Sequence, residues 1–243
     1  MTATLLRRGL LAGLLAGLLA GLFAFAFGEA TIDRAMELER VASTETHSGL
    51  PGGGEELFSR SGQKVGLFFA TGVFGVTSGG VFGLAYACFR DRLEAASEWG
   101  KSLTFAAAGF LAVFLIPFIK YPANPPTVGD PATIGIRTAS YFILIGVSLA
   151  VIVLGWLVSR KLRERGISAP VRQTLVVAGC AALVLLAFAT LPASPDPGEF
   201  PAGLLWEFRL SSFGTQTVFW AGLGVVFGLL GERAAGKREG TAV

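Results

Sequence analysis

Four side chains that suit a divalent metal ion follow the first long apolar run of the chain. Glu29, Asp33 and Glu37 recur every four residues, which places them on one face of a helix, and His47, the only histidine, lies further along the same segment. Carboxylates and a neutral imidazole bind borderline divalent metals, and concentrated negative charge attracts cations. We expect these four residues to collect a metal ion; the alternative is that the acids only pair with neighbouring arginines such as Arg34.

A second polar set lies near the ends of three later apolar runs, beside proline-rich segments. Irregular backbone at membrane depth survives only where protein or water covers it, so these segments are candidates for lining a cavity. Asp130 could instead cap the next helix, and Glu207 with Arg209 could be an interfacial ion pair. The set that we expect to line an ion pathway is Asn124, Asp130, Glu207, Arg209 and Gln216.

Six apolar runs must position these residues. Each run is about 17 to 25 residues long, the length of a helix that crosses a hydrocarbon core of about 30 Å. The mean hydropathy of +0.62 and the charged fraction of only 15% agree with this interpretation. The sequence therefore predicts an all-α polytopic membrane bundle. It forms a single transmembrane domain over residues 1–243, with an outer loop at 28–64 and spans at 9–27, 65–89, 103–119, 138–158, 172–191 and 212–231.

The charge of alternate loops predicts an orientation. With both termini in the cytoplasm, the inner segments hold 13 of the 20 Lys and Arg residues, whereas the outer segments hold seven of them together with 11 of the 17 acids. Positive loops tend to stay inside, which favours this topology. The basic residues also lie beside helix ends, where anionic lipid explains them, so the pI of about 9.1 does not indicate nucleic-acid binding.

Glycines recur at about four-residue spacing in the first, second and sixth runs. Such stripes allow two helix backbones to approach closely in lipid, so we expect tight helix packing; the alternative is a seam along which helices slide. The stripes are Gly9, Gly13, Gly17 and Gly21; Gly72, Gly75, Gly79 and Gly83; and Gly224, Gly228 and Gly231.

No motif of an enzyme is complete. Gly100, Lys101 and Ser102 match only the end of a phosphate-binding loop, without the strand and the further glycines that such a loop needs. His47 has no partner nucleophile in a recognisable arrangement, and the spans carry almost no ionisable groups. Cys88 and Cys180 stand alone within spans and are expected to be small buried apolar side chains. We predict no enzyme and no permanently bound cofactor.

The chain resembles the CbtA family of predicted cobalt transporter subunits along nearly its whole length. The matching segments are Gly28-Glu29 with Ile32-Asp33-Arg34-Ala35, Glu55-Glu56 through Ser59-Arg60 and Gln63, Lys120 to Pro126 with Val128 to Pro131, and Phe200 to Ala202 followed by Leu205-Trp206, Phe208 to Leu210 and Gly214 to Gln216. The resemblance implies a protein of the bacterial cytoplasmic membrane that is linked to cobalamin metabolism. It also implies a small one-span partner, CbtB, with a histidine-rich metal motif. Members of the family are often described with five spans, whereas six are counted here.

Two hypotheses follow. In the first, the protein imports Co²⁺ as its cargo: Glu29, Asp33, Glu37 and His47 collect the ion, and the second polar set passes it into the bundle. Oxygen ligands hold Co²⁺ less tightly than thiolates do, which permits release, although they do not exclude Ni²⁺, Zn²⁺ or Mn²⁺. In the second, the protein is a scaffold or assembly subunit that positions a metal-handling partner and transports nothing.

Overall fold

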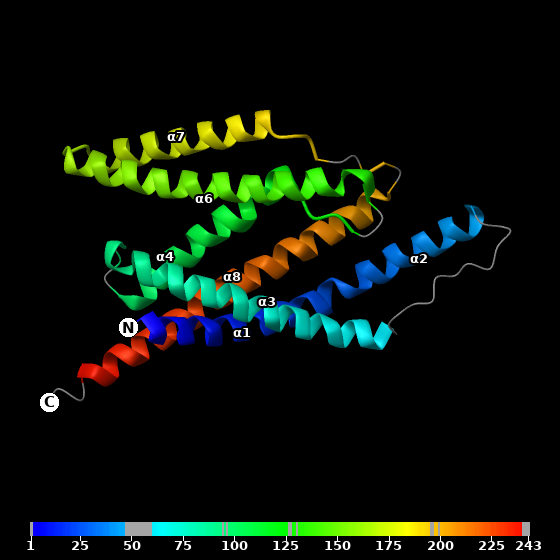
Figure 1. Cartoon of the computed structure of the whole chain (residues 1–243), viewed down its shortest axis with the longest axis horizontal. Coiled ribbons are helices and arrows are strands. Elements are labelled where there is room, and N and C mark those ends of the chain that lie inside the picture. Colours follow the sequence, from blue (N-terminus) through cyan, green and yellow to red (C-terminus); the bar gives the residue numbers. More distant parts are fainter. Residues whose placement is uncertain are drawn as a thin grey trace. The chain divides into compact units, whose positions relative to one another are not determined.

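The computed structural model describes residues 2–46, 60–93, 95, 97–125, 128–129, 131–194, 197–198 and 200–239. Within these residues all regular structure is helical (Figure 1). The elements are α1 (Thr2–Phe27), α2 (Glu29–Thr46), α3 (Arg60–Phe89), the 3₁₀ helix η1 (Arg90–Arg92), α4 (Glu98–Gly109), the π-helix η2 (Phe110–Leu115), α5 (Ile116–Lys120), the 3₁₀ helix η3 (Pro131–Thr133), α6 (Ile134–Glu164), α7 (Ala169–Thr190) and α8 (Ala202–Glu239).

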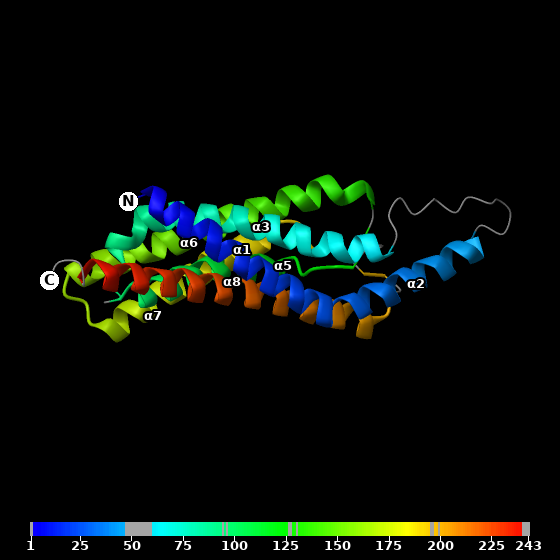
Figure 2. The same ribbon diagram turned by 90° about the horizontal axis from the view of Figure 1, so that it is seen from below.

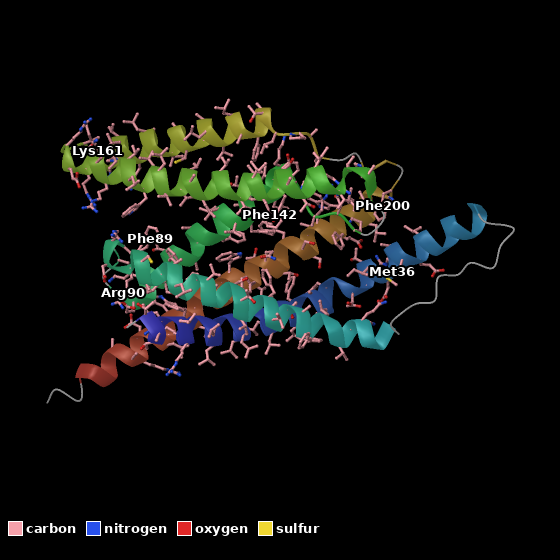
Figure 3. All side chains as sticks on the ribbon, in the orientation of Figure 1. Met36, Phe89, Arg90, Phe142, Lys161 and Phe200 are labelled. Carbon is pink, nitrogen blue, oxygen red and sulfur yellow. The ribbon has the colours of Figure 1, made fainter. Side chains whose placement is uncertain are left out.

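Six helical segments in the described residues are long and apolar enough to cross a membrane, which confirms the predicted helical membrane bundle. The helices extend past the apolar runs, because a helix satisfies its own backbone hydrogen bonds in water as well as in lipid. The clearest case is α8, which begins at Ala202 and not near Ser212. Glu207 and Arg209 therefore lie on a helix and not in a loop. In Figure 3 the cations Arg90 and Lys161 lie at helix ends.

The third span combines three elements, since α4 continues into η2 and α5 without a break. Pro117, at the start of α5, lacks the N–H group that an uninterrupted α-helix would use. The π-helical turn immediately before it is a local change in helix geometry of the kind that is often found at functional sites.

The chain divides into two compact units. Unit 1 comprises Met1–Ala107, Asn124–Thr127 and Pro201–Val243, and unit 2 comprises Ala108–Ala123 and Val128–Phe200. The core of unit 1 is formed by small residues of α1 and by large residues of α3 and α8. Its buried members include Leu5, Ala12, Ala16, Ala20, Phe82, Tyr86, Ala106, Phe219, Leu223 and Phe227.

The glycine stripes of α1 and α3 face each other in unit 1, where the two helices lie side by side (Figure 2). A Cβ atom on Gly13 would overlap the carbonyl oxygen of Gly75 and would lie 2.7 Å from the Cα of Gly79. A Cβ atom on Gly9 or on Gly79 would likewise overlap a backbone carbonyl oxygen of the other helix. The predicted tight packing is therefore confirmed for these two helices, and we call this contact the glycine seam.

In unit 2, α6 and α7 form a helical hairpin. Gly166, with a φ of 75°, ends α6, and its N–H donates to the Arg163 carbonyl at 2.9 Å. At the other end of α7, the Lys120 ammonium donates to the carbonyls of Phe188 and Leu191 at 2.7 and 3.1 Å.

Both cysteines of the chain are free: Cys180 in α7 is half-buried, whereas Cys88 in α3 is exposed, against expectation.

Candidate functional site

The first predicted metal ligand lies at the junction of α1 and α2. Gly28 allows the chain to pass almost directly from one helix to the next, since a Cβ atom there would lie 2.7 Å from the Ala24 carbonyl oxygen. Glu29 then begins α2 and is only 9% exposed, with its carboxylate 4.0 Å from the Lys64 ammonium of α3. The junction thus holds a largely buried carboxylate beside a cation at one end of unit 1.

Asp33 and Glu37 follow on α2 and are exposed. Between them, Arg34 donates from Nη1 to Glu207 Oε2 of α8 at 3.0 Å, and this pair is also exposed. Of the predicted acidic face, Asp33 and Glu37 are therefore accessible to solvent and Glu29 is not, and Arg34 pairs with a residue of another helix.

An open groove of about 480 Å³ separates the middle of α2 from the start of α8. Glu37, of the first predicted set, and Glu207, of the second, both line this groove. The lining residues are Arg34, Glu37, Leu38, Pro201, Gly203, Leu204 and Glu207. Two carboxylates from different helices thus line one groove together with Arg34, which pairs with Glu207.

Arg209 of α8 donates from Nη2 to the Asn124 side-chain oxygen at 2.9 Å. This contact ties the segment before Pro125, a buried residue, to α8 within unit 1. Gln216 lies further along α8 and is half-buried. The predicted ligand His47 and the predicted pathway residue Asp130 lie outside the described residues.

In the part of the chain that the structure describes, no three His, Cys, Asp or Glu side chains come together as a group that could hold a metal ion. Glu29, Asp33 and Glu37 instead follow one another along α2. The complete ligand set, including His47, stays a prediction.

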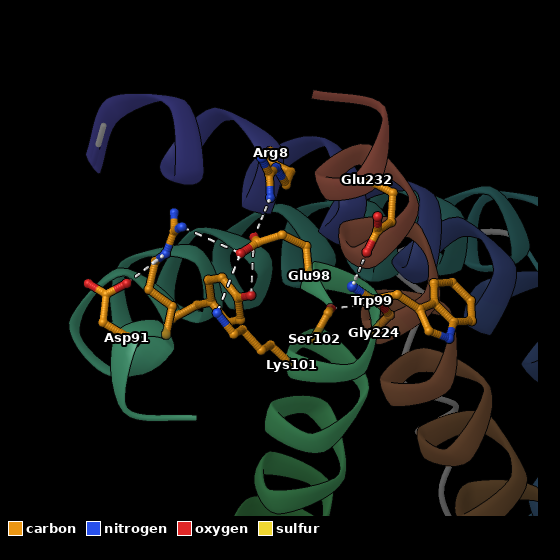
Figure 4. A network of polar contacts seen from close by, with 10 residues as sticks. Arg8, Asp91, Glu98, Trp99, Lys101, Ser102, Gly224 and Glu232 are labelled. Carbon is orange, nitrogen blue, oxygen red and sulfur yellow. Dashed lines mark hydrogen bonds and ion pairs between the residues drawn. The ribbon is translucent and has the colours of Figure 1, made fainter. Parts of the chain in front are cut away.

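A second polar centre, which the sequence did not reveal, surrounds Glu98 at the start of α4 (Figure 4). Its carboxylate oxygens lie 3.6 Å from Arg8 Nη1, 3.4 Å from Arg90 Nη2 and 4.0 Å from Lys101 Nζ. The Tyr86 hydroxyl also donates to Glu98, at 3.3 Å. We call these five residues from α1, α3, η1 and α4 the Glu98 network.

Backbone contacts add α8 to this end of unit 1. Trp99 N–H donates to the Glu232 carboxylate at 2.9 Å, so that α8 caps the first turn of α4. The buried Ser102 hydroxyl donates to the Gly224 carbonyl at 2.7 Å. The segment Gly100-Lys101-Ser102, which resembles the end of a phosphate-binding loop, is thus engaged in helix packing. The available sequence signal was the presence of acids among the basic residues at three span ends.

Aromatic rings fill the space next to the Glu98 network. The Phe82 ring centroid lies 5.1 Å from those of both Phe105 and Phe227, and the Tyr86 centroid lies 4.9 Å from that of Phe227. The Arg8 guanidinium carbon lies 5.1 Å from the Phe227 ring centroid. Phe82, Tyr86, Phe105 and Phe227 form what we call the aromatic plug, and three of its four side chains are buried.

Comparison with known proteins accounts for this membrane architecture. The family model of CbtA, described as a probable cobalt transporter subunit, matches residues 2–232. The chain belongs to the CbtA family. Neither a curated protein nor a solved structure is significantly similar to it. The family's description as a probable cobalt transporter subunit agrees with the membrane-spanning helices and points away from an enzyme. The word subunit implies a partner protein.

Proposed function

We propose that this CbtA protein takes up Co²⁺ across the bacterial cytoplasmic membrane for cobalamin metabolism, with both termini in the cytoplasm and α2 outside. The observation that carries the proposal is the largely buried Glu29 at the start of a helix whose exposed face continues with Asp33 and Glu37. A carboxylate withdrawn from water at the end of an apolar bundle is costly unless cations compensate it. Lys64, at 4.0 Å, is such a cation for Glu29, and we propose that a divalent cation collected by Asp33 and Glu37 displaces it.

In this proposal the ion is collected in two steps. The acids of α2, together with His47, raise the local Co²⁺ concentration, and the groove with Glu37 and Glu207 then receives the ion. Asn124, Asp130, Arg209 and Gln216 line the route from there. Carboxylate and amide oxygens bind Co²⁺ weakly enough to release it. The ion is cargo, and no resident cofactor is proposed.

In this proposal, a partner subunit supplies most of the histidine ligands for the metal ion. The chain has a single histidine, and imidazole is the ligand that would favour Co²⁺ over harder ions. We propose a small one-span, histidine-rich CbtB-like membrane protein for this role, and the family's description as a subunit supports it. Membrane lipid is the other expected partner.

Uptake of radioactive cobalt by cells that express both subunits tests the ligand assignment. The double variant Glu29→Gln/Asp33→Asn should reduce uptake about tenfold or more, because it removes two charges without a large change in volume. The matched control is Glu164→Gln, which removes an exposed carboxylate that pairs with Arg160 at 3.1 Å. Equal uptake by the double variant and the control, at equal membrane levels, would reject the assignment.

Sidedness has a separate test. In a Cys88→Ser/Cys180→Ser background, Glu37→Cys should react with an impermeant maleimide added to intact cells, whereas Arg163→Cys should react only after the membrane is opened. The reverse pattern would overturn the orientation and, with it, the direction of transport.

The scaffold alternative is favoured by a different observation. Apart from Glu29, the buried polar side chains of the described residues are hydroxyls, whereas many transporters carry ionisable groups inside their spans. Purified protein in liposomes separates the two functions. Cobalt flux with this chain alone supports a transporter, whereas flux that requires the partner supports a scaffold or a shared pore.

A further inference from the structure

We propose that the Glu98 network and the aromatic plug form a gate that closes the α4 end of unit 1. The inference rests on the proposed transport function, because a gate has a use only if an ion passes. It concerns the end of unit 1 opposite α2, since Arg8 lies near the start of α1 and α2 follows the end of α1.

The polar layer of the gate depends on one side chain. Glu98 accepts from Tyr86 and is paired with three cations, which come from α1, η1 and α4 itself. Figure 4 shows the carboxylate of Glu98 between Arg8 and Lys101. Because Arg8, Arg90 and Tyr86 share one carboxylate, a shift of α4 breaks these three contacts together, whereas Lys101 lies on α4 and moves with Glu98. Such an arrangement favours two discrete states over gradual loosening.

The apolar layer lies directly against the polar one. Tyr86 belongs to both layers: its ring is fully buried among Phe82, Phe105 and Phe227, and its hydroxyl reaches Glu98. A constriction of packed aromatic rings excludes water and hydrated ions, as hydrophobic constrictions do in channels. A shift of α4 would therefore withdraw Phe105 from the plug at the same time as Glu98 leaves its partners.

The helix contacts indicate that α4 is the element that moves. The glycine seam interlocks the backbones of α1 and α3, whereas the α4 atoms nearest to Gly224 and Gly228 of α8 belong to side chains. A Cβ on Gly224 would lie 2.8 Å from the Ala106 methyl group, and one on Gly228 would lie 3.1 Å from Cε3 of the Trp99 ring. Side chains can rearrange where backbone cannot, so α4 can shift on α8 once the Trp99–Glu232 and Ser102–Gly224 hydrogen bonds open. The charged groups of the network are partly exposed at the helix end, so water can solvate them once they separate.

Accessibility of Ser102 tests the gate. Ser102 is fully buried one turn into α4, and Ser102→Cys in the Cys88→Ser/Cys180→Ser background is the reporter. In purified full-length protein, Glu98→Gln should raise its rate of reaction with a water-soluble maleimide about tenfold or more, because the neutral amide no longer holds three cations. The matched control Glu164→Gln should leave the rate unchanged. An unreactive reporter in folded Glu98→Gln protein would overturn the gate.

A second reporter separates opening from unfolding. Ser140 in α6 is 5% exposed and belongs to unit 2, so Ser140→Cys should stay unreactive in the Glu98→Gln protein. If both reporters react, Glu98→Gln unfolds the protein and the proposed gate is rejected. If only Ser102→Cys reacts, the opening is local, as proposed.

A metal series separates a gate from a fixed staple. With Glu98 intact and the partner subunit present, Co²⁺ should change the Ser102→Cys rate at least about threefold, because cargo shifts the balance between the two states. If the reaction rate of Ser102→Cys does not change with Co²⁺, Ni²⁺, Zn²⁺ or Mn²⁺, the contact is static and the gate is rejected. A response to another ion but not to Co²⁺ would keep the gate and reject cobalt as the cargo, so the two proposals fail in different ways.

Discussion

The two ends of unit 1 use charge in different ways. At the α4 end, Glu98 is surrounded by cations and an aromatic plug, and its side chain is 18% exposed. At the α2 end, the Arg34–Glu207 pair borders an open groove, and its side chains are 65% and 53% exposed. Ion pairs of similar residue types thus close the α4 end and leave the groove at the α2 end open. The difference lies in the burial of the paired side chains and not in their charge.

This difference bears on ion transport. A carboxylate that is already held by three cations has little capacity left for a metal ion, so the Glu98 end is suited to closure. On α2, Asp33 and Glu37 face solvent and are open to a passing cation, whereas Glu29 is largely buried beside Lys64. The glycine seam of α1 and α3 lies between these two ends of unit 1.

The largest effect should come from breaking the glycine seam. Gly13→Leu places a side chain where the backbone of α3 passes, with the Gly79 Cα 2.7 Å from the new Cβ. We expect a loss of more than about 3 kcal/mol in the free energy of unfolding, because backbone cannot give way as a side chain can. Thermal unfolding in detergent measures it. Gly146→Leu in α6, where nothing lies within 4 Å, is the control and should change stability little.

Next in size is the removal of the Glu98 carboxylate. Glu98→Ala leaves Arg8, Arg90 and Lys101 together without their shared anion. We expect a loss of about 2 kcal/mol, below the range of about 3 to 5 for fully buried pairs because the network is partly exposed. Glu164→Ala, at an exposed pair within one helix, should cost only about 0.3 to 0.5 kcal/mol. Equal losses in the two variants would remove the contrast between buried and exposed charge.

Much of the fold follows from local sequence patterns. The six apolar runs predict the six spans because crossing lipid requires a minimum apolar length, and the glycine stripes of α1 and α3 predict their close contact. The helix ends were less predictable. The sixth predicted span begins at Ser212, whereas α8 begins at Ala202, since hydropathy detects the lipid-facing part of a helix and not its full length.

The site was predicted only in part, for a physical reason. The acids of α2 share one helix face, so their spacing alone predicted their arrangement. The Glu98 network joins residues from three spans, and no periodicity within one segment indicates that Arg8 and Arg90 meet at Glu98. In the same way, the groove with Glu37 and Glu207 depends on how α2 packs beside α8.

A smaller effect is expected at the hydrogen bond that joins α4 to α8. Ser102→Ala removes the donor to the Gly224 carbonyl, which accepts at 2.7 Å in a buried position. We expect a loss of about 1 kcal/mol in the free energy of unfolding, since interhelical hydrogen bonds in membranes are worth about 0.6 to 1.7. Thr77→Ala, which removes an exposed bond to the carbonyl of Val73 in the same helix, is the control. A larger loss at Thr77 would contradict the role of Ser102 at the α4 end.

The smallest effect should be at the α2 end. Arg34→Ala, Glu207→Ala and the double variant form a cycle that measures the coupling of the 3.0 Å pair. We expect about 0.2 to 1 kcal/mol at low salt and a smaller value at high salt, because both side chains are exposed and screened. Denaturation at two ionic strengths provides the measurement. A coupling as large as that of Glu98 with Arg8 would mean that exposure does not weaken this pair, and the two ends of unit 1 would then no longer differ.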